Sequence, residues 1–303
     1  MNALFKTDPL PAAIGAGMNG PVTQLPKDAE NSSLRRKGGA AINILQAIFL
    51  GIVQGLTEFI PVSSSGHLVF FQSLFGLKES QVFFDVMLHV GTLLAVVVYL
   101  RRDIWKMVQG TREMIRNKEI NPSARLFLWI ILATIPTGLM GVFLKGWFES
   151  LFSMPKVVGI MLLITGAFLW LTRMAKKEGR SVESMTWIDS ILIGIAQGIA
   201  IIPGISRSGA TISAGLFRGL DRELSGKFSF LLSIPAILGA TVLHLREIGT
   251  QEEIGLSLLG MAVAFIVGLV SLMLLMKIIR QGKISSFSYY CWAMGLIMIL
   301  LTE

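Results

Sequence analysis

The chain has 303 residues, of which 53% are hydrophobic and only 15% are charged. A soluble domain carries about a quarter charged residues, so this composition excludes an ordinary soluble enzyme and indicates a helical membrane protein. The net charge of +8 does not indicate nucleic-acid binding, because Lys and Arg gather in short segments between apolar runs, as in cytoplasmic loops of membrane proteins. With Cys291 as the single cysteine, a disulfide framework and a cysteine metal site are also excluded.

Residues 1–40 differ from the rest of the chain in composition. They are rich in Gly, Pro, Ala and Asn, lack apolar periodicity and end in the basic cluster at 35–37. A signal peptide has the reverse order, with a basic start before an apolar core. We therefore expect 1–40 to be a poorly ordered N-terminal extension and 41–303 to be a single membrane domain.

The membrane domain contains an internal repeat. Residues 51–66 read GIVQGLTEFIPVSSSG and residues 194–209 read GIAQGIAIIPGISRSG, so that the two motifs align without a gap. Three apolar runs of spanning length follow each motif, at 82–100, 126–144 and 157–173, and at 226–245, 255–278 and 286–302. The shared order indicates a duplication, with repeat 1 at about 41–173 and repeat 2 at about 187–302.

Each motif is interrupted by a Pro-Ser-Gly stretch between short apolar segments, and we expect it to form a re-entrant helix pair. Three crossings per repeat then place the two motifs on opposite sides of the membrane, which is an inverted-topology repeat with its site near the midplane. The predicted fold is all-α, with six transmembrane helices and two re-entrant helix pairs.

Charge in the loops sets the predicted orientation. The basic segments at 101–125, 173–187 and 277–283 are expected in the cytoplasm, and the acidic segment at 246–254 and both termini outside. The basic cluster at 35–37 conflicts with an outside N-terminus, but counting 41–60 as a full span would reverse the later loops.

The first motif carries Glu58, the only ionisable side chain between Ile44 and Val62. A carboxylate in such a run is costly unless it faces a polar cavity or a cation from another helix, so Glu58 is a candidate functional residue. Gln54 lies four residues earlier, and helical geometry therefore puts both side chains on one face.

Beyond Pro61, the stretch 62–67 reads VSSSGH. Serines and glycine at a helix start cap it and present backbone N–H groups to an anion. His67 follows Ser64 by three residues, a spacing that suits a nucleophile and its base. Taken alone, this motif is better explained by helix caps and a buried histidine.

The second motif places Arg207 directly after a run, 190–206, that has no charge. A guanidinium flanked by hydroxyls suits two-point recognition of phosphate, whereas the simpler alternative is an arginine that reaches a lipid headgroup. The repeat brings Arg207 towards Glu58 and His67 and so favours one joint site. Carboxylate, imidazole, guanidinium and hydroxyls are the groups used in phosphoryl transfer. His89 is a weaker candidate that either lines this site or packs in the core.

From about residue 41 to 302 the sequence resembles the undecaprenyl-diphosphate phosphatase family, of the type associated with bacitracin resistance. The resemblance rests on the stretch from Gln54 to His67 and on PGISRSGAT at 203–211. It implies hydrolysis of undecaprenyl diphosphate to undecaprenyl phosphate and inorganic phosphate, which recycles the lipid carrier of peptidoglycan and cell-wall synthesis and confers bacitracin resistance. It also implies Mg²⁺ or Ca²⁺, and a site open to the outer face of the bacterial plasma membrane.

The resemblance further implies roles for single residues. Ser64 resembles the nucleophile, with His67 as its base or as the acid for the leaving group. Glu58 would bind the metal or carry a proton, and Arg207 would clamp the diphosphate. Further substrate contacts are implied for Ser63, Ser65, Ser206, Ser208, Thr211 and Gln54. The carbonyl of Gln54 would also be a second metal ligand. Many members have Glu where this chain has Gln54, so a mechanism with two carboxylates is not expected here.

A transporter or flippase of an anionic or isoprenoid-phosphate substrate is the alternative, because broken helices in inverted repeats also occur in transporters. It would use Glu58 and Arg207 without a nucleophile. The expected partners are the lipid substrate and the bilayer, not nucleic acid, and a homodimer is left open. Acid-phosphatase-like lipid phosphatases are set aside, since the chain has no Arg-Pro dipeptide and neither His89 nor His244 has Asp four residues later.

Overall fold

The structure is a computed structural model that describes residues 42–77, 82–152, 154–176, 178–244 and 254–301. Within these ranges the chain is helical and has no β-strand, apart from one isolated bridge between Arg180 and Leu220. The expected extension at 1–40 and the acidic segment at 246–253 lie outside the described residues.

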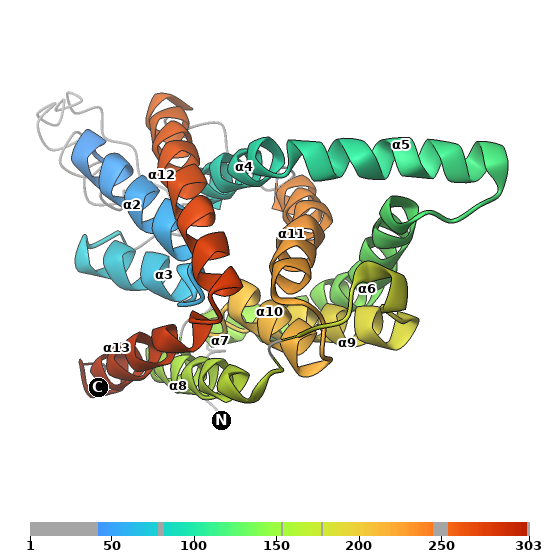
Figure 1. Cartoon of the computed structure of the whole chain (residues 1–303). Coiled ribbons are helices and arrows are strands. Elements are labelled where there is room, and N and C mark those ends of the chain that lie inside the picture. The colour runs from blue at the N-terminus through green and yellow to red at the C-terminus, as the bar shows by residue number, and fades with distance from the viewer. Residues whose placement is uncertain (1–41, 78–81, 153, 177, 245–253, 302–303) are drawn as a thin grey trace, which may run out of the picture. The chain divides into compact units, whose positions relative to one another are not determined.

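Figure 1 shows the elements in chain order: α2 (Ile44–Thr57), α3 (Ser64–Leu74), α4 (Val82–Tyr99), α5 (Arg101–Asn117), α6 (Pro122–Phe143), α7 (Lys145–Phe152), α8 (Pro155–Leu171), α9 (Trp187–Ile199), α10 (Arg207–Phe217), α11 (Arg222–His244), α12 (Ile254–Arg280) and α13 (Phe287–Leu301). Three short 3-10 turns accompany them, η1 (Thr172–Met174), η2 (Val182–Ser184) and η3 (Ile284–Ser286).

Six helices in the described ranges are long and apolar enough to cross a membrane. They are α4, α6, α8 with η1, α11, α12, and α13 with η3, and they correspond one to one with the six predicted runs. By contrast, α2 and α9 have 14 and 13 residues, and α3 and α10 have 11 each. A span needs about 20 residues, so the fold combines six long helices with two pairs of short ones.

The segment at 101–125 contains a helix that the sequence analysis did not predict. In α5, Met107 and Gly110 are buried, while Trp105 and Ile115 are exposed between basic residues. Asp103 forms an ion pair with Lys227 of α11 at 3.0 Å, and this contact holds the start of α5 against α11. Exposed apolar and basic side chains on one helix are typical of a helix that lies in the membrane interface.

Each short helix pair packs on a long helix from the other half of the chain. α2 packs along α12, and α9 packs along α6. In the same way α4 contacts α12 and α11 contacts α6, while α8 pairs with α13 and α4 with α11. Figure 1 shows α2 beside α12 and α8 beside α13. The contacts of α2 and α4 with α12 thus have counterparts in the contacts of α9 and α11 with α6.

Glycines of the repeated motif allow this close packing. A Cβ atom at Gly55 would lie 2.8 Å from the backbone nitrogen of Gly268 on α12. At Gly194 a Cβ atom would overlap the carbonyl oxygen of Ala133 on α6. Small residues four apart let two helix backbones touch in a membrane, which explains why the motif keeps a glycine pair in both halves.

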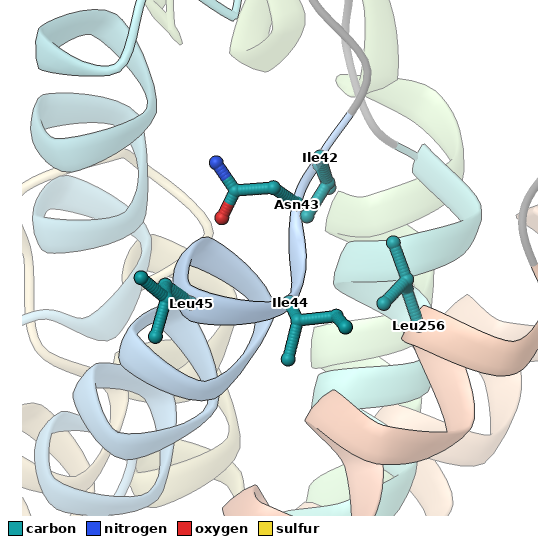
Figure 2. Close-up of a pocket in the computed structure, with 5 residues that line it drawn as sticks. All are labelled: Ile42, Asn43, Ile44, Leu45 and Leu256. Carbon is teal, nitrogen blue, oxygen red and sulfur yellow. The ribbon is translucent and has the colours of Figure 1, made fainter.

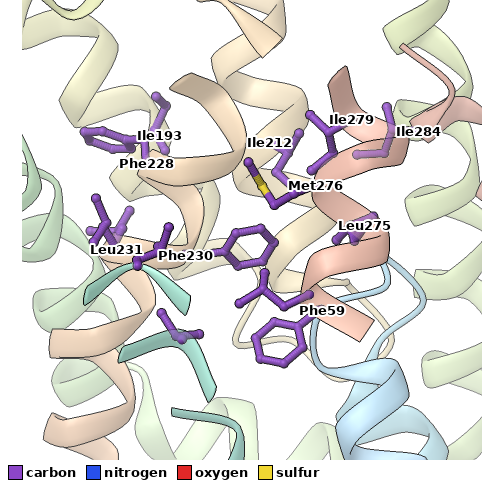
Figure 3. Close-up of a cluster of buried hydrophobic side chains, with 14 of the residues drawn as sticks. Phe59, Ile193, Ile212, Phe228, Phe230, Leu231, Leu275, Met276, Ile279 and Ile284 are labelled. Carbon is purple, nitrogen blue, oxygen red and sulfur yellow. The ribbon is translucent and has the colours of Figure 1, made fainter. Parts of the chain in front are cut away.

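The main hydrophobic core lies between the two halves, as Figure 3 shows. Phe59, which follows the end of α2, packs edge-to-face against Phe230 of α11 with a centroid distance of 5.7 Å. Ile212 of α10 and Met276 of α12 belong to the same cluster. Since Phe59 is the neighbour of Glu58, this core fixes the end of the first motif against the second half.

Replacing Gly194 with alanine should separate α9 from α6, because the added methyl group overlaps the backbone at Ala133. Overpacking of this kind lowers the free energy of unfolding by about 1–3 kcal/mol. The thermal unfolding midpoint of the purified protein in detergent measures the loss. Gly138→Ala is the matched control, since Gly138 is also helical and has nothing within 4 Å of an added Cβ. Equal midpoints for the two variants would contradict this packing.

Candidate active site at the two helix breaks

The first motif places Ser64 at the start of α3. α2 ends at Thr57, and Glu58 caps it with its N–H donated to the carbonyl of Gln54. Ser63 then adopts φ 67° and ψ 92°, a backbone conformation that is strained for a residue other than glycine. The Oγ of Ser63 accepts a hydrogen bond from the N–H of Gly66 at 3.4 Å and so caps α3, as predicted.

The second motif places Arg207 at the start of α10. α9 ends at Ile199, and the chain turns at Gly204, whose φ of +94° favours glycine. Ser206 caps α10, because its Oγ accepts a hydrogen bond from the N–H of Gly209 at 3.1 Å. Ser206 aligns with Ser63 in the repeat, so the two breaks share their cap and differ at the residue that follows it.

The two breaks meet through a buried ion pair. Arg207 Nη2 donates to Glu58 Oε1 at 2.7 Å, and their side chains are 17% and 7% exposed. The other carboxylate oxygen, Oε2, accepts from Ser64 Oγ at 2.7 Å and from Gln54 Nε2 at 3.0 Å. The structure therefore brings Glu58, Ser64, Gln54 and Arg207 together, and Glu58 is the group that all three contact.

His89 lies at the edge of this group. Its Nε2 is 3.7 Å from Glu58 Oε2, and its side chain is 32% exposed. Its Nδ1 lies 2.8 Å from the carbonyl oxygen of Asp85, to which it must donate because a carbonyl only accepts. Of the two interpretations of His89, the structure favours the one in which it lines the site.

His67 is buried and has other partners than Ser64. Its Nδ1 lies 2.8 Å from the carbonyl oxygen of Ser63, and its Nε2 lies 2.7 Å from the hydroxyl of Tyr290 on α13. Because the Ser63 carbonyl only accepts, Nδ1 carries the hydrogen and, in the neutral ring, Nε2 accepts from Tyr290. Ser64 thus donates to Glu58 rather than to His67.

The remaining predicted hydroxyls hold the breaks together. Ser206 Oγ and Ser208 Oγ lie 3.2 Å apart, and both side chains are buried. Thr211 Oγ1 bonds to Ser229 Oγ at 2.6 Å, beneath Arg207. In the first motif, Ser63 Oγ and half-buried Ser65 Oγ are 3.4 Å apart. Direct contacts of these hydroxyls with a substrate stay a prediction.

Two residues of the site were missed by the sequence analysis. The carbonyl of Ser229 accepts from Arg207 Nη1 at 3.4 Å. A signal for it exists, since Ser225, Ser229 and Ser233 recur every four residues and form a polar stripe on an apolar helix. Tyr290 contacts His67 across 223 positions of sequence, and its apolar run carries no pattern that singles it out.

Two side chains of the first motif, Gln54 and Glu58, carry oxygen atoms that could bind a metal ion. Gln54 Oε1 is buried and has no hydrogen-bond partner among the described residues. Within those residues, no group of three or more His, Cys, Asp or Glu side chains could hold a metal ion. The donors fit a cation that uses Glu58 and the Gln54 carbonyl and takes its other ligands from substrate oxygens and water, as Mg²⁺ commonly does.

The pocket in Figure 2 is a different feature of the surface. It lies at the start of α2 and is lined by Ile42, Asn43, Ile44, Leu45 and Leu256. Its polar side chain, Asn43, is engaged in capping α2. The lining contains none of the residues that meet at the helix breaks, so this apolar pocket offers no phosphate chemistry.

Comparisons with known proteins agree on one family. Residues 47–297 match the family described as bacitracin resistance protein BacA. An undecaprenyl-diphosphatase of Desulforapulum autotrophicum is 44% identical over 272 residues, which covers 86% of this chain and 98% of the relative. An undecaprenyl-diphosphatase of Carboxydothermus hydrogenoformans is 44% identical over 266 residues, with the same coverage. A third, of Desulfatibacillum aliphaticivorans, is 43% identical over 264 residues and covers 83% and 96%.

Removing the guanidinium by Arg207→Met should destabilise the protein, since it leaves Glu58 buried without its counter-charge. Breaking a buried pair in this way costs about 3–5 kcal/mol of unfolding free energy, measured by thermal unfolding in detergent. The double variant Glu58→Gln with Arg207→Met should recover part of the loss, because no lone charge remains.

The control for this experiment is Arg280→Met, which breaks a pair with Glu223 that is 50% and 41% exposed. A surface pair contributes about 0–1 kcal/mol, so this variant should unfold close to the wild type. Equal losses for Arg207→Met and Arg280→Met would contradict the buried pair.

Proposed function

This chain belongs to the bacitracin resistance protein BacA family of undecaprenyl-diphosphatases, and we propose that it hydrolyses undecaprenyl diphosphate to undecaprenyl phosphate and inorganic phosphate in the membrane. The observation that carries the proposal to individual residues is the contact of Glu58 with both Ser64 and Arg207. A hydroxyl, a carboxylate that accepts its proton and a guanidinium for phosphate oxygens are placed together at one point.

We infer that the two short helix pairs are re-entrant. Asp189 near the start of α9 accepts from Arg218, just after the end of α10, at 2.6 Å. Phe49 in α2 packs against Phe71 and Phe75 at the end of α3, with centroid distances of 5.0 and 5.5 Å. The outer ends of each pair therefore meet, while the two breaks face each other through Arg207 and Glu58.

The repeated helix contacts support the inverted-topology arrangement. Each pair of short helices packs on a long helix of the opposite half, and the breaks of both pairs meet at one point. This is the arrangement that inverted repeats adopt around a site near the membrane midplane.

The orientation rests on the basic segments. Arg125 donates to the carbonyl of Glu183 at 2.6 Å, which joins the segment at 101–125 to that at 173–187. Arg173 donates to Tyr289 at 2.9 Å. This bond joins the segment at 173–187 to the start of α13, close to the segment at 277–283. All three basic segments thus lie near one another, and the positive-inside rule puts them in the cytoplasm. The α2–α3 pair then opens towards the outer face of the bacterial plasma membrane.

Substrate binding would begin at Arg207. A guanidinium has five N–H donors, and the contacts to Glu58 and to Ser229 leave others for phosphate oxygens. The first turns of α3 and α10 add backbone N–H groups that favour an anion. The isoprenoid tail stays in the bilayer, beside exposed apolar side chains of α2 such as Leu56.

Hydrolysis follows from the hydrogen bond between Ser64 and Glu58. A bound diphosphate competes for Arg207 and loosens its hold on Glu58, so that the carboxylate can take the Ser64 proton. The Ser64 oxygen attacks the terminal phosphorus, and the bond from that phosphorus to the bridging oxygen breaks, so that undecaprenyl phosphate leaves. Water then attacks the phosphorus of phosphorylated Ser64, the bond from that phosphorus to the Ser64 oxygen breaks, and inorganic phosphate leaves. Glu58 returns its proton to the Ser64 oxygen and so restores the hydroxyl.

A bound Mg²⁺ or Ca²⁺ would neutralise charge on the diphosphate. Glu58 and the carbonyl oxygen of Gln54 are the protein groups that would hold it. Because Gln54 is a neutral amide, it orients Glu58 through its Nε2 and cannot serve as a second base.

The product explains the physiological role that we propose. Undecaprenyl phosphate is the lipid carrier of peptidoglycan synthesis, and regenerating it confers bacitracin resistance. The transporter or flippase alternative is not favoured, since the relatives are named as diphosphatases. The hydrogen bond from Ser64 to Glu58 supports the proposed hydrolysis. The proposed partner of the site is the lipid substrate in the bilayer.

Purified protein should release phosphate from farnesyl diphosphate or undecaprenyl diphosphate, and Ser64→Ala should lower kcat by about 10³-fold or more, because the nucleophile is lost. Colorimetric phosphate release measures both. Ser73→Ala is the matched control, since Ser73 is an exposed serine of the same helix. Phosphate release by Ser64→Ala at the wild-type rate would show that water attacks directly.

Removing divalent cations with a chelator tests whether phosphate release requires a metal ion. EDTA should abolish phosphate release, and Mg²⁺ or Ca²⁺ should restore it, since neither Arg207 nor the helix N-termini can alone balance a diphosphate. Gln54→Glu should raise the affinity for the cation, because a second carboxylate joins the site, and the cation dependence of kcat measures this. Full activity in EDTA would refute the metal requirement.

A further inference from the structure

The break in the first motif is supported by helix α13. Ser63 holds a strained backbone conformation one residue before Ser64, and strain of this kind persists only where surrounding contacts enforce it. The carbonyl of Ser63 accepts from His67 Nδ1, and the carbonyl of Pro61 accepts from Cys291 Sγ at 3.3 Å. Cys291 and Tyr290 are adjacent on α13, so this helix contacts the break directly at Pro61 and, through His67, at Ser63.

Tyr290 forms a hydrogen bond with His67, the residue that donates to the Ser63 carbonyl. Its hydroxyl lies 2.7 Å from His67 Nε2, and the two rings are nearly parallel, with 15° between their planes. A hydroxyl that donates to Nε2 keeps the hydrogen of the neutral ring on Nδ1, where it faces the Ser63 carbonyl. Tyr290 and the Ser63 carbonyl therefore fix the orientation and tautomer of His67 together.

We propose that Tyr290 is a positioning residue for the reaction: through His67 it holds the strained Ser63 carbonyl and so keeps Ser64 aimed at Glu58. This rests on the proposed function, in which Ser64 is the nucleophile. His67 then acts by donating a hydrogen bond, not by removing the Ser64 proton, which the 2.7 Å contact assigns to Glu58. The last helix of the second repeat thus positions the nucleophile of the first.

Tyr290→Phe is the first test, because it removes only the hydroxyl. We expect kcat for farnesyl diphosphate to fall about tenfold, the effect of losing one buried hydrogen bond, with KM within about twofold of wild type. Tyr289→Phe is the matched control. Its hydroxyl accepts from Arg173 and does not contact His67, so both constants should stay within about twofold.

His67 variants separate positioning from base catalysis. His67→Asn keeps a donor near the place of Nδ1, whereas His67→Ala keeps none. We expect His67→Asn to recover at least tenfold of the kcat lost in His67→Ala, and Tyr290→Phe to cause no further loss in the His67→Ala background. Equal kcat for the Asn and Ala variants would overturn the proposal and make His67 the base.

Backbone exchange at the break tests the same support without requiring enzymatic activity. Hydrogen–deuterium exchange of the peptide at 58–67, followed by mass spectrometry, should be faster in Tyr290→Phe than in Tyr289→Phe, because the break loses its support. Unchanged exchange together with unchanged kcat would overturn the proposal, as would a tenfold rise in KM alone, which would make Tyr290 a substrate contact. If the wild type releases no phosphate but exchange is still faster in Tyr290→Phe than in Tyr289→Phe, the proposed function is refuted. The support of the break by Tyr290 would then still stand.

Discussion

The buried contact between Arg207 and Glu58 is the interaction on which the rest of the structure depends. Neither charge is stable alone in an apolar environment, and each compensates for the other at 2.7 Å. The pair also joins the two helix breaks, which come from different halves of the chain. A negatively charged substrate is the natural competitor for the guanidinium, so the interaction that holds the resting site together is also the one that a diphosphate would rearrange.

The two partners of the ion pair come from two similar sequence motifs. Gly51 and Gly194 allow the same close helix contact in each half, and Ser63 and Ser206 cap the helix that follows each break. The two motifs differ at the positions that form the ion pair, since Glu58 aligns with Ile201 and Arg207 aligns with Ser64. The residue after the cap is Ser64 in one half and Arg207 in the other, and both contact Glu58.

Local physical rules explain which features could be predicted from sequence. The six long helices follow from apolar length, the caps from Ser-x-x-Gly at each break, and the contact of Gln54 with Glu58 from their spacing of four. Other features depend on long-range contacts. His67 was paired with Ser64 because they are close in sequence, yet its ring nitrogens face Ser63 and Tyr290. Helix α5 was missed because its basic residues suggested only a loop.

Binding of a non-hydrolysable farnesyl methylenediphosphonate tests the central claim most directly, since it needs no turnover. Isothermal titration of the purified protein, with Mg²⁺ present, would compare the wild type with Arg207→Lys and with the exposed control Arg280→Lys. We expect binding by the wild type and the control, and at least tenfold weaker binding by Arg207→Lys, which keeps the charge and loses the fork of N–H donors. Equal affinities for all three proteins would contradict a diphosphate site at the paired helix breaks.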